Sequence, residues 1–264
     1  MVFGLFTRRR RERLRAQPVP PAWRAIVERN LPIFRRLPRA DQEELLGHVQ
    51  VFIAEKHFEG CGGLALTDEI RVTIAAQACL LLLHRDTDYY PRLRSILVYP
   101  TGYTAHGEQH VEGGIWEEGP EDLLGHTQED LRAMVLSWDS VKHGARDATD
   151  GENLVLHEFA HQLDFEDDTT NGTPPLGSRA EYHAWGRVMR EEFEALRAAD
   201  DAGEETLIDP YGAEDPAEFF AVVTEAFFEQ PHALRRRHPA LYERLAAFYR
   251  QDPTSFVSPP HESD

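Results

Sequence analysis

The stretch "LVLHEFAHQLDFED", from Leu154 to Asp167, decides how the rest of the chain is interpreted. It predicts a helix, in which residues four positions apart lie on the same face. His157 and His161 could therefore each direct a ring nitrogen at one cation. Glu158 lies one position further round, where its carboxylate would meet a water on that cation. This HExxH pattern is typical of two metal ligands followed by a general base.

A helix that carries histidines without binding a metal is the alternative. The chain contains 13 histidines, and HExxH arises by chance in about a few per cent of such chains. A second pair with the same spacing, His106 and His110 in "HGEQH", lies in a predicted loop. The residues around His157 and His161 are apolar and predict a buried helix. Two imidazoles and a carboxylate in such surroundings need a partner charge, which favours a metal.

A catalytic metal needs a third protein ligand and an open coordination position. The predicted helix "DPAEFFAVVTEAFF" offers Glu218 and Glu225, seven residues apart and therefore on one face. Glu218 has another interpretation, because Asp215 at the N-cap, Pro216 at the first helical position and Glu218 form a capping-box pattern. The two interpretations are compatible, and spacing alone does not choose between the two glutamates.

Two more polar residues are each seven residues from a candidate metal ligand. Asp164 follows His157 by seven residues on the same predicted helix, and we interpret it as a group that orients a histidine rather than as a ligand. Tyr211 precedes Glu218 by seven residues, and its hydroxyl could stabilise an oxyanion near the metal. A tyrosine in a loop before a helix is more commonly a packing residue.

Composition restricts the class of protein. The chain has 264 residues and a net charge of −18. Six arginines lie within the first 16 residues, so the remainder carries about −23. This acidic body argues against direct nucleic-acid binding. The sequence lacks an apolar run of about 18 residues, so we expect no membrane span. Cys61 and Cys79 form no disulfide framework, and with no predicted secretion signal we expect a cytoplasmic protein.

The chain divides into three parts by pattern. Residues 1–20 predict a basic, disordered tail. Residues 21–253 predict a single domain, with a helical part over 21–90 and a catalytic part over 91–253. Residues 254–264 predict an irregular tail.

The elements expected within the domain are mostly helical. Two short β-rich stretches, Ser95–Pro100 and Ala133–Trp138, predict strands. The glycine-rich "FEGCGG" predicts a loop, and Asp41 and Thr67 predict helix N-caps. The pattern indicates an α+β fold dominated by helices, with a small sheet.

Taken together, these motifs resemble the Mlc titration factor A family of zinc-dependent peptidases. The resemblance rests on "HEFAHQLD", "IDPYGAEDPAEFFAVVTEAFF" and "RHPALYERLAAFYRQDP", with "LTDEIRVTIAAQACLLLL", "ILVYP" and "VLSWDSV". It extends from about Trp23 to Pro253. The site is also similar to that of the catalytic domain of anthrax lethal factor, where HExxH is followed by a tyrosine and a glutamate seven residues apart. The chain departs from the family in its arginine-rich N-terminus and in the acidic loop from Thr101 to Gln128.

The resemblance implies a zincin-like, gluzincin-like metallopeptidase domain whose small sheet edges the active-site cleft. It implies one Zn²⁺ per chain, bound by His157, His161 and Glu218, with Glu158 as general base and Tyr211 as oxyanion donor. Asp164 and Glu225 would then support the ligands. It also implies aminopeptidase-type action on a peptide or protein substrate. A Mlc-like transcription repressor is the implied partner. The alternative hypothesis is a regulatory protein that sequesters such a repressor, with weak or vestigial catalysis.

Overall fold

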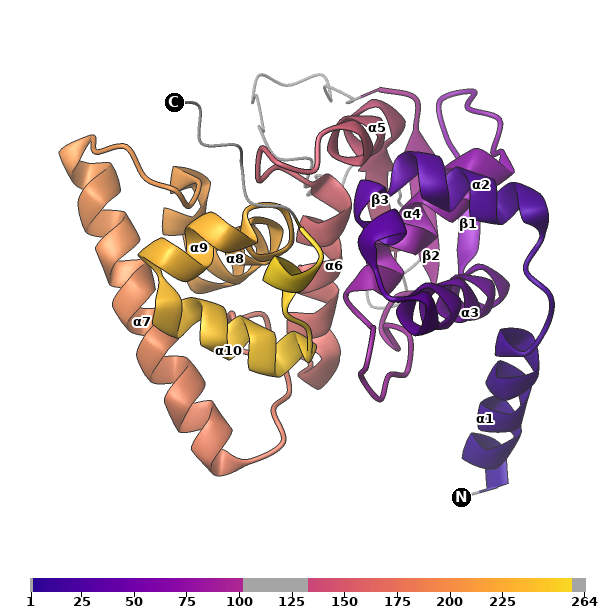
Figure 1. The fold of residues 1–264 in the computed structure, drawn as a ribbon, viewed down its shortest axis with the longest axis horizontal. Helices are drawn as coiled ribbons and strands as arrows, with labels where there is room; N and C mark the ends of the chain where they lie inside the picture. Colours follow the sequence, from indigo (N-terminus) through magenta and orange to yellow (C-terminus); the bar gives the residue numbers. More distant parts are fainter. Residues whose placement is uncertain (1, 102–132, 258–264) are drawn as a thin grey trace, which may run out of the picture.

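The computed structural model describes residues 2–101 and 133–257, and most of them are helical (Figure 1). The helices that precede the second strand are α1 (Val2–Arg15), α2 (Pro21–Asn30), α3 (Arg39–Glu55) and α4 (Asp68–Leu80). The later helices are α5 (Trp138–Arg146), α6 (Leu154–Asp164), α7 (Arg179–Ala202), α8 (Pro216–Glu229), α9 (Pro231–Arg237) and α10 (Pro239–Tyr249). Short 3₁₀ helices are η1 (Pro32–Arg36), η2 (Phe165–Asp167), η3 (Pro210–Ala213) and η4 (Pro253–Ser255).

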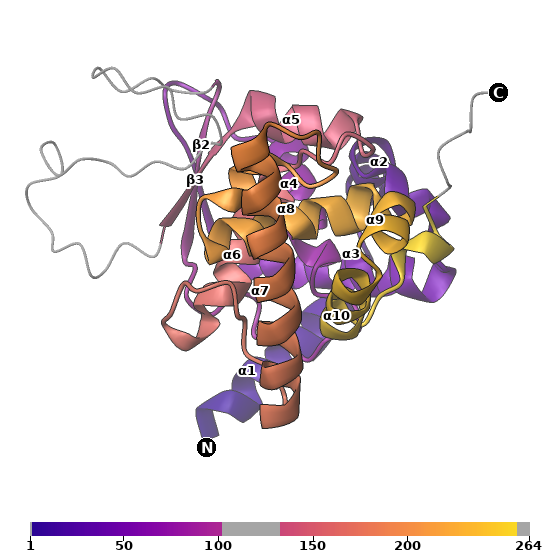
Figure 2. The same ribbon diagram turned by 90° about the vertical axis from the view of Figure 1, so that its left-hand side faces the viewer.

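Three parallel strands form the predicted small sheet. Their order is β1 (His57–Gly60), β2 (Ser95–Tyr99) and β3 (Ala133–Ser137). Parallel neighbours need a crossover connection, and α4 lies in the one between β1 and β2. One face of β2 and β3 is buried, through Ile96, Val98, Met134 and Leu136. Figure 2 shows the sheet at one side of the molecule, with the helices on the other. The expectation of a helix-dominated α+β fold is confirmed.

Helix α8 is buried along its whole length, because the helices around it cover every side. It begins as the sequence predicts: the Asp215 carboxylate accepts hydrogen bonds from the backbone N–H groups of Ala217 (2.7 Å) and Glu218 (3.0 Å), and Pro216 occupies the first helical position. A helix that is apolar on all sides belongs in a core. The few carboxylates on α8 therefore need specific partners.

Helix α6 lies between the two halves of the molecule (Figure 1). Its N-cap, Asn153, accepts a hydrogen bond from the N–H of Leu156 at 3.1 Å. Phe159, on the side of α6 that faces the N-terminal half, packs edge-on against Phe52 and Tyr90, with ring centroids 5.6 and 4.7 Å apart. These contacts hold the helix that carries the HExxH pattern in a fixed orientation.

Three local predictions were wrong. Residues 2–15 form α1 instead of a disordered tail, since the Arg11 guanidinium pairs with Glu55 (3.0 Å) and Asp88 (2.8 Å) across the fold. The first residues of "FEGCGG" belong to β1, which pairs with β2. Helix α3 begins at Arg39, so Asp41 lies within its first turn.

The remaining predictions either fall on residues that the structure does not describe or are confirmed by it. The loop from Thr101 to Gln128 with its histidine pair, and the tail beyond residue 257, lie outside the described residues. The predicted strands and the Thr67 N-cap are confirmed, although Trp138 begins α5. Within the described part of the chain, none of the helices has the length and apolar content that a bilayer crossing requires.

Candidate metal centre

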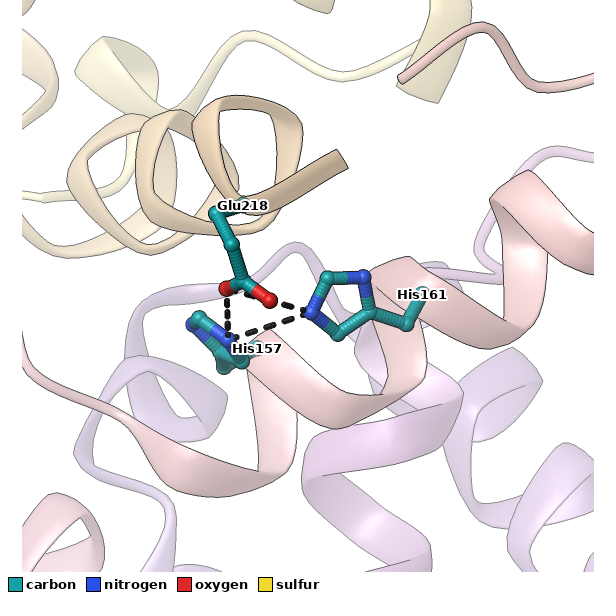
Figure 3. Close-up of side chains that lie close together, drawn as sticks. All are labelled: His157, His161 and Glu218. Atoms are coloured by element: carbon teal, nitrogen blue, oxygen red, sulfur yellow. Dashed lines mark hydrogen bonds and ion pairs between the residues drawn. The ribbon is translucent and has the colours of Figure 1, made fainter. Parts of the chain in front are cut away.

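Helix α6 places His157 and His161 on one face, one turn apart. Their rings meet edge to face with centroids 4.9 Å apart, and their Nε2 atoms are separated by 3.2 Å (Figure 3). His157 is buried, while His161 is partly exposed. The two imidazoles therefore converge on one point, as the sequence predicts.

Glu218 reaches the same point from the first turn of α8. Its Oε2 atom lies 3.1 Å from Nε2 of His157 and 3.5 Å from Nε2 of His161 (Figure 3). The Asp215 cap fixes the backbone of Glu218 and leaves its side chain free to point at the histidines. The structure thus resolves the choice that spacing left open: Glu218, rather than Glu225, joins the two histidines. We call His157, His161 and Glu218 the metal triad.

Glu225 contacts His157 from the opposite side of the ring. The Nδ1–H group of His157 donates to Oε1 of Glu225 at 2.8 Å, and Oε2 of Glu225 accepts from the backbone N–H of Asn153. Because Nδ1 carries the hydrogen, Nε2 of neutral His157 presents a lone pair to the triad. A carboxylate in this position orients the ring and increases its basicity as a ligand.

The donor atoms of the triad match a metal ion. Three atoms that accept hydrogen bonds or bind cations face one another at 3.1, 3.2 and 3.5 Å. Ligands at zinc distances in a tetrahedral arrangement are about 3.3 Å apart. Two imidazole nitrogens and one carboxylate oxygen are a set that zinc binds in catalytic sites. A cation at their centre would satisfy all three acceptors at once.

The pKa values of the triad residues show that the site favours a positive charge. Burial alone would lower the pKa of His157, but hydrogen bonds to Glu218 and Glu225 outweigh it and raise the pKa to about 10. Burial would raise the pKa of Glu218, yet its contacts with His157 and His161 lower it to about 2. A proton therefore occupies the site when no metal does.

Glu158 lies near the triad, and one of its carboxylate oxygens has no partner in the described part of the chain. Its Oε1 atom is inaccessible to solvent and makes no hydrogen bond to any described residue. Burial raises the pKa of this carboxyl to about 7, although the nearby His157 and His161 oppose the shift. A buried acceptor with an unused lone pair next to a metal site is suited to hold a water and to take its proton.

Tyr211 lies in η3, close to the triad. Its ring centroid is 6.0 Å from that of His157, and the Asp209 carboxylate fixes the turn by accepting from the N–H of Tyr211 at 2.9 Å. Burial and the neighbouring carboxylates, Glu218 first among them, raise the pKa of the phenol above its usual range. The hydroxyl is therefore protonated near neutral pH and available as a donor.

The sequence comparisons agree with this geometry. A profile of the glucose-regulated metallo-peptidase M90 family matches residues 5–250. The chain belongs to the M90 family. It is also 38% identical over 244 residues to an uncharacterised protein of Synechocystis, covering 92% of this chain and 89% of that one. Mlc titration factor A of Edwardsiella ictaluri is 34% identical over 228 residues, which cover 84% of this chain and 85% of that protein. The corresponding protein of Serratia proteamaculans is 32% identical over the same length, with the same coverage of both chains. This M90 member is therefore a metallopeptidase, and its cluster of His157, His161 and Glu218 fits an HExxH-plus-glutamate metal site.

Asp164 has other partners than the sequence predicts. Its carboxylate accepts hydrogen bonds from the backbone N–H groups of Gly172 (2.8 Å) and Thr173 (2.7 Å), so it holds the loop that follows α6. Gly172 has a φ of +72°, and a Cβ atom there would lie 2.1 Å from the carbonyl oxygen of Pro216. Only glycine permits this close approach. In this M90 chain Asp164 therefore fixes the loop against the start of α8, and its hydrogen bonds with the described residues go to backbone groups.

The sequence analysis missed Glu229, which holds the N-terminus of α6. Its carboxyl oxygens contact the Asn153 side-chain amide at 2.9 Å and the N–H of Gly151 at 3.1 Å. Burial raises the pKa of Glu229 to about 9, helped by Asp150. The spacing of Glu225 and Glu229, four residues apart on an otherwise apolar helix, was the signal available in the sequence.

Proposed function

We propose that the chain is a zinc-dependent aminopeptidase, in which His157, His161 and Glu218 hold one Zn²⁺. The observation that carries this proposal is the convergence of three acceptor atoms beside the unpartnered carboxylate oxygen of Glu158. The histidine and glutamate donors favour zinc over calcium or magnesium, which prefer oxygen ligands alone.

The residues around the triad supply the remaining parts of peptide hydrolysis. A zinc ion bound there would act as a Lewis acid on the scissile carbonyl and lower the pKa of a water to about 7. Glu158 takes the proton of the attacking water through its free Oε1 and delivers it to the leaving nitrogen. A carboxyl whose pKa is about 7 can both accept and return a proton near neutral pH. Tyr211 donates its hydroxyl to the carbonyl oxygen as negative charge develops there.

Charge near Tyr211 supports action at a free N-terminus. The exposed Glu214 lies close enough to Tyr211 to affect its titration, and Asp215 adds to the negative charge. A negative environment beside the metal favours a substrate that carries an α-ammonium group. An aminopeptidase would therefore cleave alanine p-nitroanilide but not its N-acetylated form.

The experiment that tests the proposal replaces Glu158 with Gln. The Glu158→Gln variant should keep one zinc per chain, measured by elemental analysis, while kcat/KM for alanine p-nitroanilide falls by about 10²–10⁴. Glu152→Gln makes the same chemical change at an exposed position just before α6 and should leave both values unchanged. Normal turnover by Glu158→Gln would contradict the role of Glu158.

A second candidate function is binding of a Mlc-type transcription repressor. The identity of 34% with a Mlc titration factor A supports it. Such a partner requires a cytoplasmic protein, and the free thiols of Cys61 and Cys79 suit that reducing compartment. The inactive Glu158→Gln variant separates the two functions. If it still captures a purified Mlc-type repressor, binding does not depend on catalysis. If neither form binds the repressor, the peptidase function stands alone.

A further inference from the structure

Arg85 carries a positive charge that the structure leaves unpaired. It follows α4, and its guanidinium lies over the ring of Phe248, 4.0 Å from the centroid. Its Nη1 atom is inaccessible to solvent, and no described residue accepts a hydrogen bond from it. Within the described ranges, Glu166 lies near enough to act electrostatically on Arg85, but no carboxylate comes within ion-pair distance of its guanidinium. Burial accordingly lowers the pKa of Arg85.

An unpaired, largely buried cation destabilises a folded protein unless something compensates for it. Arg11 shows what the chain does elsewhere, because its half-buried guanidinium binds both Glu55 and Asp88. The stacking of Arg85 on Phe248 provides some compensation but satisfies none of its N–H groups. A guanidinium that is held flat and has no ion-pair partner among the described residues is suited to pair with an oxyanion that enters the cavity it lines.

The surroundings of Arg85 supply a space for such a ligand. Arg85 lines a cavity of about 270 Å³ together with Arg244, in the middle of α10, and Arg250, which directly follows that helix. The Nη1–H group of Arg250 donates to the carbonyl of His84 at 3.1 Å, which keeps this side chain beside Arg85. Asp86 and Glu181 also line the cavity, so its three arginines exceed its acids by one in a chain of net charge −18. Leu176, Trp185 and Phe248 supply apolar walls.

We propose that this cavity binds a small organic oxyanion, either a phosphate monoester or a carboxylate, whose acidic group pairs with Arg85. Arg244 and Arg250 complete the positive wall, and the apolar side chains receive the organic part of the ligand. The volume is that of a small metabolite rather than of a peptide. The site is distinct from the metal triad and needs no metal.

Calorimetric titration of the full-length protein tests the proposal with four probes. Inorganic phosphate and acetate probe the charge, while phenyl phosphate and benzoate add an apolar group. We expect at least one aromatic probe to bind more tightly than its small counterpart. Tighter binding of phenyl phosphate identifies a phosphate ester, and tighter binding of benzoate identifies a carboxylate. If none of the four binds at concentrations up to about 10 mM, the proposal is wrong.

Arginine variants test where the probe binds, and their melting temperatures show whether the variant proteins are folded. Arg85→Met should weaken binding by about tenfold or more, and Arg244→Met should weaken it less. Arg236→Met removes the same charge from an exposed position on α9 and should change nothing. Because Arg85→Met removes an unpaired charge, its ligand-free melting temperature should equal or exceed that of the wild type. A lower melting temperature with unchanged affinity for the probes would assign Arg85 a purely structural role and overturn the proposal.

Discussion

The metal triad has a counterpart elsewhere in the fold. Asp41, Glu44 and His84 also bring ligand atoms within 4.8 Å of one another, but they combine one histidine with two carboxylates instead of two histidines with one. The two groups differ in burial, since the second is partly exposed, with the His84 side chain 36% accessible. They differ more in how their hydrogen-bond donors and acceptors are matched. In the triad, three acceptor atoms face one another, and only a shared proton or a cation can neutralise them.

Donors and acceptors are already matched in the second group. Oε1 of Glu44 accepts hydrogen bonds from the backbone N–H of His84 at 3.1 Å and from Nε2 of His48 at 3.3 Å. The hydrogen bond from His48 is the main reason that the pKa of Glu44 falls to about 2. The ring of His84 lies 3.4 Å from Oδ2 of Asp41. This group ties α3 to the turn after α4, and its bonds form without a metal. Residue type and proximity therefore do not suffice to define a metal site.

Removing one histidine from each group should give the clearest contrast. His157→Ala eliminates a ligand and should reduce bound zinc from one per chain to almost none, with an affinity loss of at least about a thousandfold. His84→Ala should leave the zinc content unchanged. Elemental analysis after dialysis against a weak chelator measures both. Loss of zinc from His84→Ala instead would place the metal in the second group.

A smaller effect is expected when the support of a ligand is removed. Glu225→Ala leaves the metal triad intact but frees the Nδ1 side of His157, so zinc should bind about 10- to 100-fold more weakly. Glu225→Gln keeps an oxygen that can accept from His157 and should restore part of the affinity. Competition with a chromophoric chelator measures the dissociation constants. Glu44→Gln is the control, and an equal loss of affinity in that variant would show that the effect is not specific to α6.

The smallest effect concerns folding stability. Its dependence on pH has opposite signs at Glu44, in the second group, and at Glu229, on the helix that carries Glu218 of the metal triad. The folded pKa of Glu44 is depressed, so its stabilisation is present above pH 4.5 and is lost as the pH falls toward 2. The folded pKa of Glu229 is raised, so the folded state loses stability as the pH rises from 4.5 to about 9. Glu229→Gln imitates the protonated side chain. It should raise the melting temperature by about 5 °C at pH 8 and change it little at pH 4.5.

Glu44→Gln provides the opposite case for that measurement. It should lower the melting temperature at pH 7 and matter less near pH 2.5, where the wild-type carboxylate is itself partly protonated. Thermal unfolding followed by circular dichroism at the four pH values tests both predictions. A uniform change in melting temperature across pH for either variant would contradict the pKa shift of that residue.

Much of this architecture follows from local pattern. The helix over Leu154–Asp164, the cap at Asp215 and the strand beginning at Ser95 each depend on neighbours in sequence, and the sequence predicts them. The convergence of His157 and His161 follows from helical geometry in the same way. The choice of Glu218 required either a resemblance or the docking of α8 on α6, since both Glu218 and Glu225 point toward α6.

The features that the sequence did not predict depend on distant partners. Helix α1 is basic and looks solvated until Glu55 and Asp88 are brought beside it. The partners of Asp164 are backbone groups of a loop, which no side-chain pattern reveals. Glu229 acts through the N-cap of another helix, 76 residues away in the chain. Tertiary contact, rather than propensity, determines all three.

The position of α8 in the chain has a consequence for the timing of activity. Its carboxylates at Glu218, Glu225 and Glu229 contact α6 or its N-cap residue, and Glu218 follows His157 by 61 residues in the sequence. During synthesis, α6 leaves the ribosome with two histidines and no third ligand. The hydrolytic centre is complete only after α8 has been made and has packed in place. A nascent or misfolded chain is therefore an inert one, and the cell is not exposed to an unfinished protease.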